Sequence, residues 1–372
     1  MQLAFDLRTL DDHFPGIARY GYELALALLR LPAGPQLSVI LPATPRTRFD
    51  LTPLLAGAQV VRSDAAVFGL RQHWEIGRII RDLGADVALF PYYVRPLWTS
   101  CPAITVVYDA ISWRVPELFS PLKRVQIRVL HHLALARSAA ICTMSRSAAA
   151  DLVQFYSLNP ARLSLTSGGV SRQFSPRPAP EIAAFRAAHS LPERYIVYLA
   201  SDKPHKNIPL LLNAWAAANT GAVGLVLAGR WFDPATERLL DRDPLRGRVW
   251  RLPAVAEADL PTLYSGALAL AFPSRYEGFG LPPLEALACG TPVLAARTSS
   301  LPEVVGDAGV LLPLEPGAWT SAIEAICHNP AHHADLTQRA RPQAARFRWD
   351  DTARQVYATS LGCLERASSS RD

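Results

Sequence analysis

The chain has 372 residues, of which 50% are hydrophobic and 19% are charged, and its formal net charge is +6 at pH 7. This composition is typical of a packed globular protein and excludes a disordered one, and the length favours two domains over a single core. The positive charge is compatible with nucleic acid, acidic lipid or a phosphorylated small molecule as partner, and charge alone does not distinguish among them.

Five cysteines are spread along the chain without a CxxC pair and without ligand-like spacing to histidine, so we expect neither a disulfide framework nor a zinc site. The N-terminus enters a strand pattern at once and lacks the basic start and long apolar run of a signal peptide. Charges or prolines interrupt every apolar window before it reaches the length of a membrane span. These features predict a cytoplasmic protein that does not cross a membrane.

Short apolar runs alternate with longer segments of helical period over nearly the whole length, which is typical of parallel βαβ units. Helices are expected between the strands, chiefly at Ile17–Leu29, Pro121–Arg137 and Arg146–Tyr156. The strands expected in the first half are Leu3–Leu7, Leu37–Leu41, Gln59–Arg62, Asp86–Phe90, Ile104–Tyr108, Ala140–Met144 and Leu163–Ser167.

Four prolines between Ser175 and Pro192 interrupt this alternation around a short helical stretch, Glu181–His189, and we place the domain junction there. After about residue 315 the pattern is helical to the end, with a break near Arg346–Asp350. Two open parallel sheets that face each other would bind a ligand in the crevice between them. The strands expected in the second half are Tyr195–Ala200, Val223–Gly229, Arg248–Leu252, Leu268–Phe272, Pro292–Ala295 and Val310–Leu312.

The segment 268–296, LALAFPSRYEGFGLPPLEALACGTPVLAA, has the pattern of strand, loop, helix, loop and strand. Gly278 and Gly280 lie in the first loop, two prolines follow where proline suits the first turn of a helix, and Gly290 is expected as the C-cap. Glycines before a helix N-terminus leave backbone N–H groups accessible, and the helix dipole adds positive potential. This geometry predicts a diphosphate site.

Two carboxylates, Glu277 and Glu285, flank this predicted anion site. A carboxylate accepts hydrogen bonds from paired sugar or ribose hydroxyls better than a neutral group does. The competing interpretation is that Glu277 starts a solvated loop and that Glu285 only favours the helix N-terminus by its charge. The pair, with GFG between its members and a βαβ frame around it, favours the hydroxyl-binding interpretation.

This segment resembles the signature EGFGLPxLEAxAxGxPV of retaining GT-B glycosyltransferases of family 4 (glycosyl transferases group 1), which include bacterial mannosyl- and glucosyltransferases. The resemblance implies an α/β fold of two Rossmann-like parallel-sheet domains that face each other across a cleft. It also implies that Glu277 contacts the donor sugar beside the departing phosphate and that Glu285 holds the ribose hydroxyls. The residues whose amides would line the sugar and the diphosphate are Gly278, Phe279, Gly280 and Leu281.

Further segments resemble the same family. SDKPHKNIPLLLNAWA is similar to the loop whose lysine grips the donor phosphates, which implies this role for Lys206, whereas Ser201 stands where many relatives have an arginine. RLPAVAEADLPTLYSGA is similar to the loop beside the nucleobase, with Val255 as the candidate contact. FPGIARYGYEL is similar to the GGIxRY loop, in which Gly16 would let the backbone approach donor or acceptor closely.

TVVYDAISW is similar to a strand end that carries histidine before aspartate in relatives, so Asp109 is implied as a catalytic polar group, while Tyr108 replaces the histidine. LTSGGVSRQFSP is similar to the segment that closes the first domain. FRWDDTARQVYATSL is similar to the helix that returns to the N-terminal domain. The implied domains are an acceptor-binding domain at 1–175 with the C-terminal helix 349–366, and a donor domain at 190–345.

The function implied by the resemblance is transfer of a hexosyl group from a nucleotide-diphosphate sugar to a glycan or lipid-linked acceptor, with retention of configuration and without a metal or another cofactor. GDP-mannose is the favoured donor, followed by UDP-glucose or another UDP-sugar. The alternatives are a sugar-nucleotide epimerase or a phosphorylase on a similar frame, and a non-catalytic nucleotide-binding or nucleic-acid-binding module. The last lacks the clustered aromatic and basic stripes of nucleic-acid-binding proteins.

The segment SPLKRVQIRVLHHLALARSA combines basic residues with an apolar remainder at helical spacing. Such a helix is either a docking face for anionic lipid at the inner side of a membrane or an amphipathic helix that covers the sheet, and the sequence leaves both interpretations open. The basic residues and histidines concerned are Lys123, Arg124, Arg128, His131, His132 and Arg137.

Overall fold

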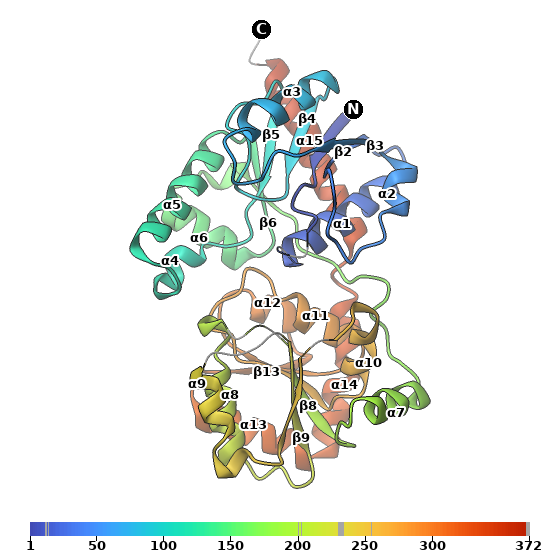
Figure 1. Ribbon diagram of the computed structural model, residues 1–372, viewed down its shortest axis with the longest axis vertical. Coiled ribbons are helices and arrows are strands. Elements are labelled where there is room, and N and C mark those ends of the chain that lie inside the picture. Colours follow the sequence, from blue (N-terminus) through green and yellow to red (C-terminus); the bar gives the residue numbers. More distant parts are fainter. Residues whose placement is uncertain are drawn as a thin grey trace. The chain divides into compact units, whose positions relative to one another are not determined.

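The computed structural model describes residues 1–11, 13, 15–199, 201, 203–229, 234–253 and 255–369. The chain divides into two compact units, Met1–Gly169 together with Arg348–Asp372, and Val170–Phe347 (Figure 1). Each unit is built on one parallel sheet with helices on its faces. No helix in the described ranges is both long and apolar enough to span a membrane.

The sheet of the first unit has seven strands in the order β3-β2-β1-β4-β5-β6-β7, all parallel. All seven predicted strands are confirmed, within two residues at either end. The strands are buried and rich in Val, Ile, Leu and Ala because helices cover both of their faces. Their bounds are β1 (Gln2–Asp6), β2 (Gln36–Pro42), β3 (Gln59–Ser63), β4 (Val87–Phe90), β5 (Ala103–Val106), β6 (Ala140–Thr143) and β7 (Leu163–Leu165).

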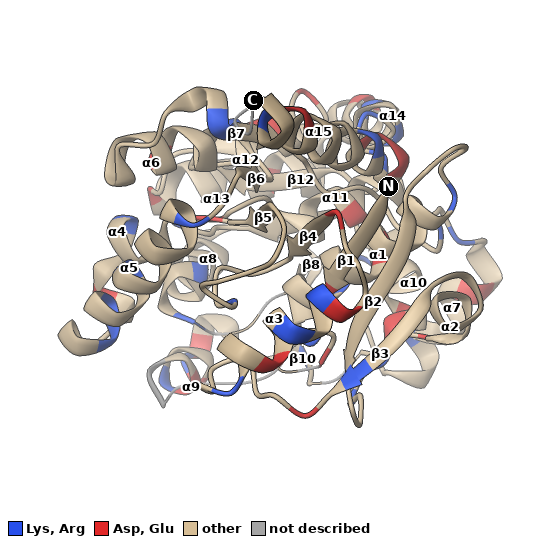
Figure 2. Ribbon diagram, turned by 90° about the horizontal axis from the view of Figure 1, so that it is seen from above, with Lys and Arg blue, Asp and Glu red and all other residues tan. Residues whose placement is uncertain are grey.

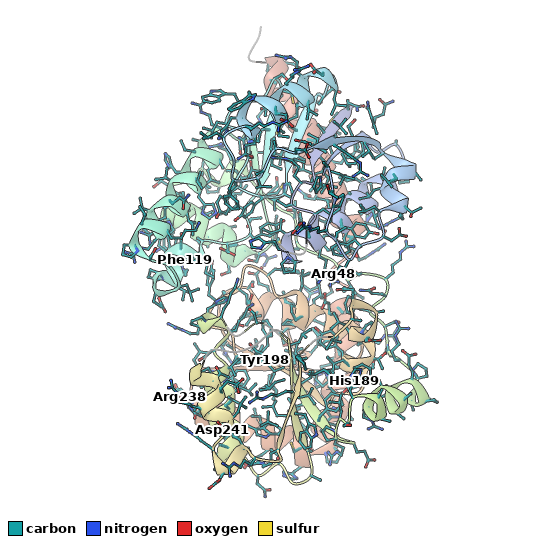
Figure 3. All side chains as sticks on the ribbon, in the orientation of Figure 1. Arg48, Phe119, His189, Tyr198, Arg238 and Asp241 are labelled. Atoms are coloured by element: carbon teal, nitrogen blue, oxygen red, sulfur yellow. The ribbon has the colours of Figure 1, made fainter. Side chains whose placement is uncertain are left out.

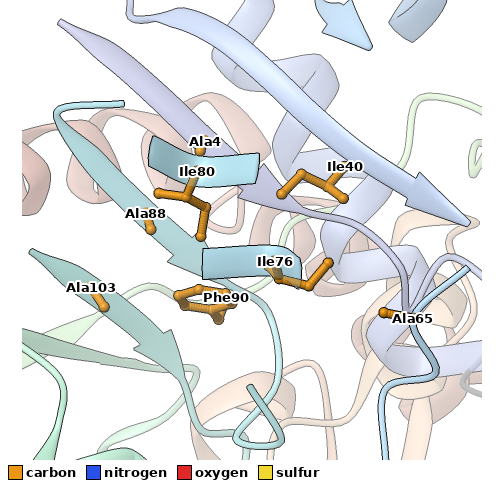
Figure 4. Close-up of a cluster of buried hydrophobic side chains, with 8 residues drawn as sticks. All are labelled: Ala4, Ile40, Ala65, Ile76, Ile80, Ala88, Phe90 and Ala103. Atoms are coloured by element: carbon orange, nitrogen blue, oxygen red, sulfur yellow. The ribbon is translucent and has the colours of Figure 1, made fainter. Parts of the chain in front are cut away.

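Helices α3, α5 and α6 lie on one face of this sheet. Ile76 and Ile80 of α3 pack on alternate residues of β1, β2, β4 and β5, as Figure 4 shows. The strand register puts Ile141 of β6 on the same face as Ala103 of β5, and Ile141 packs against Leu135 of α5. The helices of this unit are α1 (Pro15–Leu29), α2 (Thr52–Gly57), α3 (Gln72–Asp82), α4 (Ile111–Arg114), α5 (Pro121–Ala136), α6 (Arg146–Tyr156) and α15 (Trp349–Ser369), with 3₁₀ turns η1 (Pro116–Leu118) and η2 (Pro160–Arg162).

The C-terminal helix α15 packs on α1 in the first unit, as the sequence predicts. The rings of Tyr20 and Trp349 meet edge to face with centroids 5.5 Å apart, and the Thr352 hydroxyl donates a hydrogen bond to the Ser167 carbonyl. At Gly169 any side chain would collide with the backbone of Trp349. These contacts tie two ends of the unit that are far apart in the sequence.

The sheet of the second unit has six parallel strands in the order β10-β9-β8-β11-β12-β13, and each predicted strand is confirmed within one residue over its described part. The predicted end Ala200 of the first of these strands lies outside the described residues. The strands are β8 (Tyr195–Leu199), β9 (Gly224–Ala228), β10 (Val249–Leu252), β11 (Ala269–Phe272), β12 (Val293–Ala296) and β13 (Gly309–Leu312). The helices are α7 (Ala179–Ala188), α8 (Ile208–Ala217), α9 (Pro234–Leu240), α10 (Leu260–Ser265), α11 (Leu281–Ala288), α12 (Leu301–Val305), α13 (Pro316–His328) and α14 (Pro330–Ala344), with 3₁₀ turns η3 (Pro204–Lys206), η4 (Asp243–Leu245) and η5 (Glu257–Asp259).

The second unit begins at Val170, before the proline-rich stretch at Ser175–Pro192 where the sequence suggests a junction. This stretch belongs to the second unit because it is bonded and packed there. Phe174 lies 6.2 Å from the ring of Tyr264, and the amide of Arg177 donates to the Ser265 hydroxyl. The prolines therefore shape a connection on the surface of the second unit, and α7 is the short helix expected among them.

Large aromatic side chains fill the core of the second unit. Trp215, Trp319, Tyr195 and Tyr198 are fully buried, and Figure 3 labels Tyr198 beside the central strands. The Tyr195 hydroxyl donates to the Leu263 carbonyl at 2.7 Å, so this buried polar group is satisfied. The core fixes the positions of the loops that follow β8 and β11.

We predict that Gly309→Ala destabilises the protein by about 1–3 kcal/mol, because a Cβ there would collide with the Val293 carbonyl of the neighbouring strand and lie 2.7 Å from Val305 Cγ1. Urea unfolding measures the change. The matched control is Gly317→Ala in α13, where a Cβ meets no described atom within 4 Å and alanine suits the helix. Equal unfolding midpoints for both variants would contradict the close approach of β12 and β13.

Candidate functional site

The strand order of the second sheet reverses between its two central strands, β8 and β11. In doubly wound sheets, loops leave such a switch point in opposite directions and open a space at the carboxyl ends of the strands, where ligands bind. Lys206 follows β8 and Glu277 follows β11. The topology thus brings together two residues that are 71 positions apart.

Lys206 and Glu277 form an ion pair, with 2.6 Å between Nζ and Oε1. Their side chains are only 17% and 13% exposed, and the ammonium group lies 5.4 Å from the ring centroid of Phe272, which ends β11. A partly buried pair is screened less by water than a surface pair. The sequence places both residues at the donor site in separate roles, and the direct contact between them is a finding of the structure.

The loop that carries Lys206 is held by its neighbours on both sides. Asn207 adopts a left-handed conformation with φ +58° and ends the turn η3. The carbonyl of buried His205 accepts a hydrogen bond from the amide of Arg275 at 2.7 Å, which ties this loop to the one that carries Glu277. Burial, with the adjacent Lys206 charge, lowers the pKa of His205 to about 4, so its imidazole is neutral near pH 7.

Two serines hold the backbone at Glu277. The amide of Glu277 donates to Ser299 Oγ at 2.8 Å, and Ser300 Oγ donates to the carbonyls of Glu277 and Phe279 at 3.0 and 2.6 Å. Both serines lie in the loop between β12 and α12, and sequence reasoning missed them. The available signal was the run TSS directly after a buried strand, because hydroxyl side chains at a strand end commonly bond nearby backbone groups.

Helix α11 begins beside this loop. Gly280 is its N-cap with φ +117°, a conformation that strongly favours glycine, and no side chain caps the helix. Pro282 and Pro283 occupy the first turn, as predicted, and have no N–H to offer. The predicted anion site therefore depends on the amides of Gly278–Leu281. At the other end of α11, Cys289 is the C-cap. The predicted C-cap glycine, Gly290 with φ +82°, is the next residue.

Glu285 lies in the second turn of α11 and is only 5% exposed. The hydroxyl of Tyr264, a fully buried residue of α10, donates to Glu285 Oε2 at 3.3 Å. A buried carboxylate needs hydrogen-bond donors, and the Tyr264 hydroxyl supplies one of them. Burial of Glu285 contradicts the interpretation in which it is only a favourable surface charge of the helix.

The other predicted donor-site residues of the second unit are Ser201 and Val255. Ser201 is half-buried, and its carbonyl accepts the Tyr198 hydroxyl at 3.1 Å. Val255 is half-buried in the loop between β10 and η5. Neither position contradicts the predicted role, and neither tests it.

Gly16, Tyr108 and Asp109 belong to the first unit. Gly16 is exposed in the first turn of α1, where a Cβ would meet no described atom within 4 Å, so packing does not require glycine there. Asp109 Oδ1 accepts the amide of Ile111 at 2.9 Å and thus caps the start of α4. The buried Tyr108 hydroxyl has no hydrogen-bond partner among the described residues, and burial holds its pKa well above 10. Tyr108 is therefore uncharged and cannot act as the histidine it replaces would.

Comparisons with known proteins match both halves of the chain. The family model of glycosyltransferase family 4 covers residues 15–174, and that of glycosyl transferases group 1 covers residues 181–343. The chain is 31% identical over 262 residues to O-antigen chain mannosyltransferase B of Escherichia coli, with 68% of each chain covered. It is 31% identical over 227 residues to the serotype-specific mannosyltransferase WbdA of Escherichia coli, over 58% of this chain and 28% of that protein.

Among solved structures, an Anabaena protein in complex with UDP and glucose has a TM-score of 0.75 at 20% sequence identity, over 97% of this chain and 99% of that chain. A sucrose-phosphate synthase from Thermosynechococcus elongatus has a TM-score of 0.76 at 20% identity, with both chains covered completely. These likenesses show the GT-B fold of two Rossmann-like parallel-sheet domains. With both halves matched and a mannosyltransferase related at 31% identity, the chain belongs to glycosyltransferase family 4, the glycosyl transferases group 1.

Proposed function

We propose that this glycosyltransferase moves a hexosyl group from a nucleotide-diphosphate sugar to a glycan or lipid-linked acceptor, with retention of configuration and without a metal ion. The observation that carries the proposal is the Lys206–Glu277 ion pair at the switch point of the second sheet. Glu277 lies on the loop that leads into α11. The family assignment favours transfer over the epimerase and binding-module alternatives.

In this proposal, Lys206 is the group that receives the diphosphate. A phosphate that enters the site offers the ammonium group two or more anionic oxygens, against the single Glu277 carboxylate oxygen that lies 2.6 Å from Lys206 Nζ. The donor thus replaces Glu277 as partner of Lys206. Together with the amides at the start of α11, the lysine would stabilise the charge that develops on the departing diphosphate.

Release from Lys206 frees the Glu277 carboxylate to accept hydrogen bonds from the donor sugar. The serine bonds hold the Glu277 backbone on both sides, so only its side chain has to turn. Glu285, whose carboxylate is held beside Tyr264, would accept hydrogen bonds from the two ribose hydroxyls. In the same proposal, Ser201 lies beside the donor phosphates and Val255 contacts the nucleobase.

We assign donor binding to 190–345 and acceptor binding to 1–175 with the C-terminal helix 349–366. In the acceptor domain, Gly16 offers exposed backbone at the start of α1, and Asp109 is a carboxylate near a strand end. GDP-mannose is the favoured donor because the relatives at 31% identity are mannosyltransferases. UDP-glucose is second, since a relative of the same fold was solved with UDP and glucose at only 20% identity.

We predict opposite effects on nucleotide affinity when the two members of the pair are neutralised. Lys206→Met should weaken GDP binding, because it removes the cation, whereas Glu277→Gln should leave GDP binding unchanged or tighter, because the carboxylate no longer competes for Lys206. Both variants should lower kcat by about 10²–10³-fold, as loss of a group that stabilises the transition state does. Isothermal titration with GDP and initial-rate assays measure the two effects.

The matched control is Arg251→Ala, which breaks an exposed ion pair with Glu237 in the same unit and should change neither quantity. If Lys206→Met and Glu277→Gln both retained full transfer, the site would be assigned wrongly. If Glu277→Gln weakened GDP binding as much as Lys206→Met, the exchange of partners would be wrong.

We predict turnover with GDP-mannose and at least tenfold lower kcat/KM with UDP-glucose, and an axial glycosidic bond that matches the axial donor bond. A panel of nucleotide sugars with an oligosaccharide or lipid-linked acceptor, followed by NMR of the product, measures both. Preference for a UDP-sugar would overturn the choice of donor, and an inverted product would overturn the stereochemistry.

A further inference from the structure

Exposed large apolar side chains gather in one part of the first unit. A water-exposed tryptophan or leucine is ordinary when it stands alone, but a contiguous group of them marks an interaction surface. We call this group the apolar-basic face, together with Lys123, Arg124 and Arg137. Its apolar members, with their exposed fractions, are Phe68 (54%), Leu70 (76%), Trp74 (64%), Trp98 (60%), Leu122 (82%), Val125 (56%) and Val129 (50%).

The members of the apolar-basic face come from the loop 64–71, helix α3, the loop 91–102 and helix α5. Helix α3, the loop 91–102 and helix α5 all cover the same face of the first sheet. The Lys123 ammonium lies 5.9 Å from the ring of Phe68, and the Arg137 guanidinium lies 5.6 Å from the ring of Trp98. On its other side Trp98 meets His73 of α3, with ring centroids 6.5 Å apart. The face is therefore continuous from α3 to both ends of α5.

Helix α5 has one side packed against the interior of the first unit and the opposite side exposed to solvent. Buried His131 is hydrogen-bonded to the Tyr156 hydroxyl at 2.9 Å, and burial lowers its pKa to about 3. The Arg128 guanidinium stacks 3.5 Å from the ring of Trp113 and donates to the Ser112 carbonyl. Buried His131 and half-buried Arg128 thus contact neighbouring elements of the unit, so neither belongs to the outward side of α5.

The outward side of α5 is formed by Leu122, Val125 and Val129, which are three and four residues apart and share one side of the helix. A helix that only covers a sheet buries its apolar residues and exposes polar ones. Here the apolar stripe points to solvent on a helix whose opposite side is already packed, so sheet coverage alone does not account for it.

The charge around the apolar stripe is positive. The sequence has no Asp or Glu from residue 119 to residue 150, and Lys123 and Arg137 are exposed on α5 and at its C-cap. Figure 2 marks basic residues on both α3 and α5. Both acidic residues of α3 form ion pairs with nearby arginines, Arg71–Glu75 and Arg78–Asp82.

We propose that the apolar-basic face docks the protein on the surface of an anionic lipid bilayer. Tryptophan, leucine and valine would enter the boundary between headgroups and acyl chains, while lysine and arginine, whose long stems reach back to the headgroups, would pair with lipid phosphates. Charge complementarity favours an anionic bilayer as the partner. The apolar side chains of the face match the acyl region of the bilayer, and the cations beside them match its anionic headgroups. The apolar-basic face belongs to the first unit, whereas the proposed donor site belongs to the second, so lipid binding does not depend on the identity of the donor.

Flotation with vesicles tests the proposal on the full chain. Wild type should bind vesicles of equal parts phosphatidylglycerol and phosphatidylcholine, and bind vesicles of phosphatidylcholine alone at least tenfold more weakly. Each cation near an anionic surface contributes about 1 kcal/mol, or about fivefold in affinity, so K123E with R124E should weaken binding by more than tenfold. Leu122→Ser with Val125→Ser should have a similar effect, and because both side chains are exposed, the fold should survive.

The matched control is Leu55→Ser with Leu361→Ser, which removes two exposed leucines from α2 and α15, away from the face, and should leave vesicle binding unchanged. GDP titration and thermal unfolding report the donor site and the fold independently in every variant. The proposal is wrong if wild type ignores anionic vesicles, or if the control lowers binding as much as the face variants do. A wild-type dimer in sedimentation that K123E with R124E converts to monomer would assign the face to a second copy of the chain instead.

Discussion

The ion pair between Lys206 and Glu277 is the interaction on which the proposed donor site depends. It joins the loops that follow the two central strands of the second sheet, where the strand order reverses and neighbouring loops are directed apart. Each group of the pair satisfies the other's charge, which keeps two partly buried ions from standing alone. In the proposed function, a diphosphate sugar enters by exchange of partners, without leaving either charge unpaired.

The surrounding structure keeps this exchange local. Serine hydroxyls hold the backbone on both sides of Glu277, and the carbonyl of His205 anchors the amide of Arg275. The Glu285 carboxylate accepts a hydrogen bond from the hydroxyl of Tyr264, which is part of the packed core. The side chains that would meet the donor thus stand on a rigid frame, which limits the reorganisation that catalysis has to include.

The first unit uses its helices in another way. Its sheet is covered by α3, α5 and α6 on one face and by α1 and α15 on the other, yet α5 carries apolar side chains on its outward side as well. Periodicity alone predicts an amphipathic helix at this position, and it does not reveal which side faces the sheet. The structure shows that His131 and Arg128 contact aromatic neighbours from α6 and α4, a choice that the sequence left open.

The alternation of short apolar runs with helical segments was enough to predict all thirteen strands of the two sheets, because buried parallel strands need nearly continuous apolar residues. The Glu277 and Glu285 spacing was likewise readable, since strand, loop and helix of one βαβ unit are local in sequence. Only the tertiary structure decided that Lys206 touches Glu277, that Ser299 and Ser300 hold its backbone, and that Tyr264 reaches Glu285. Those contacts join distant segments, and their geometry follows from strand order and core packing, which no local pattern encodes.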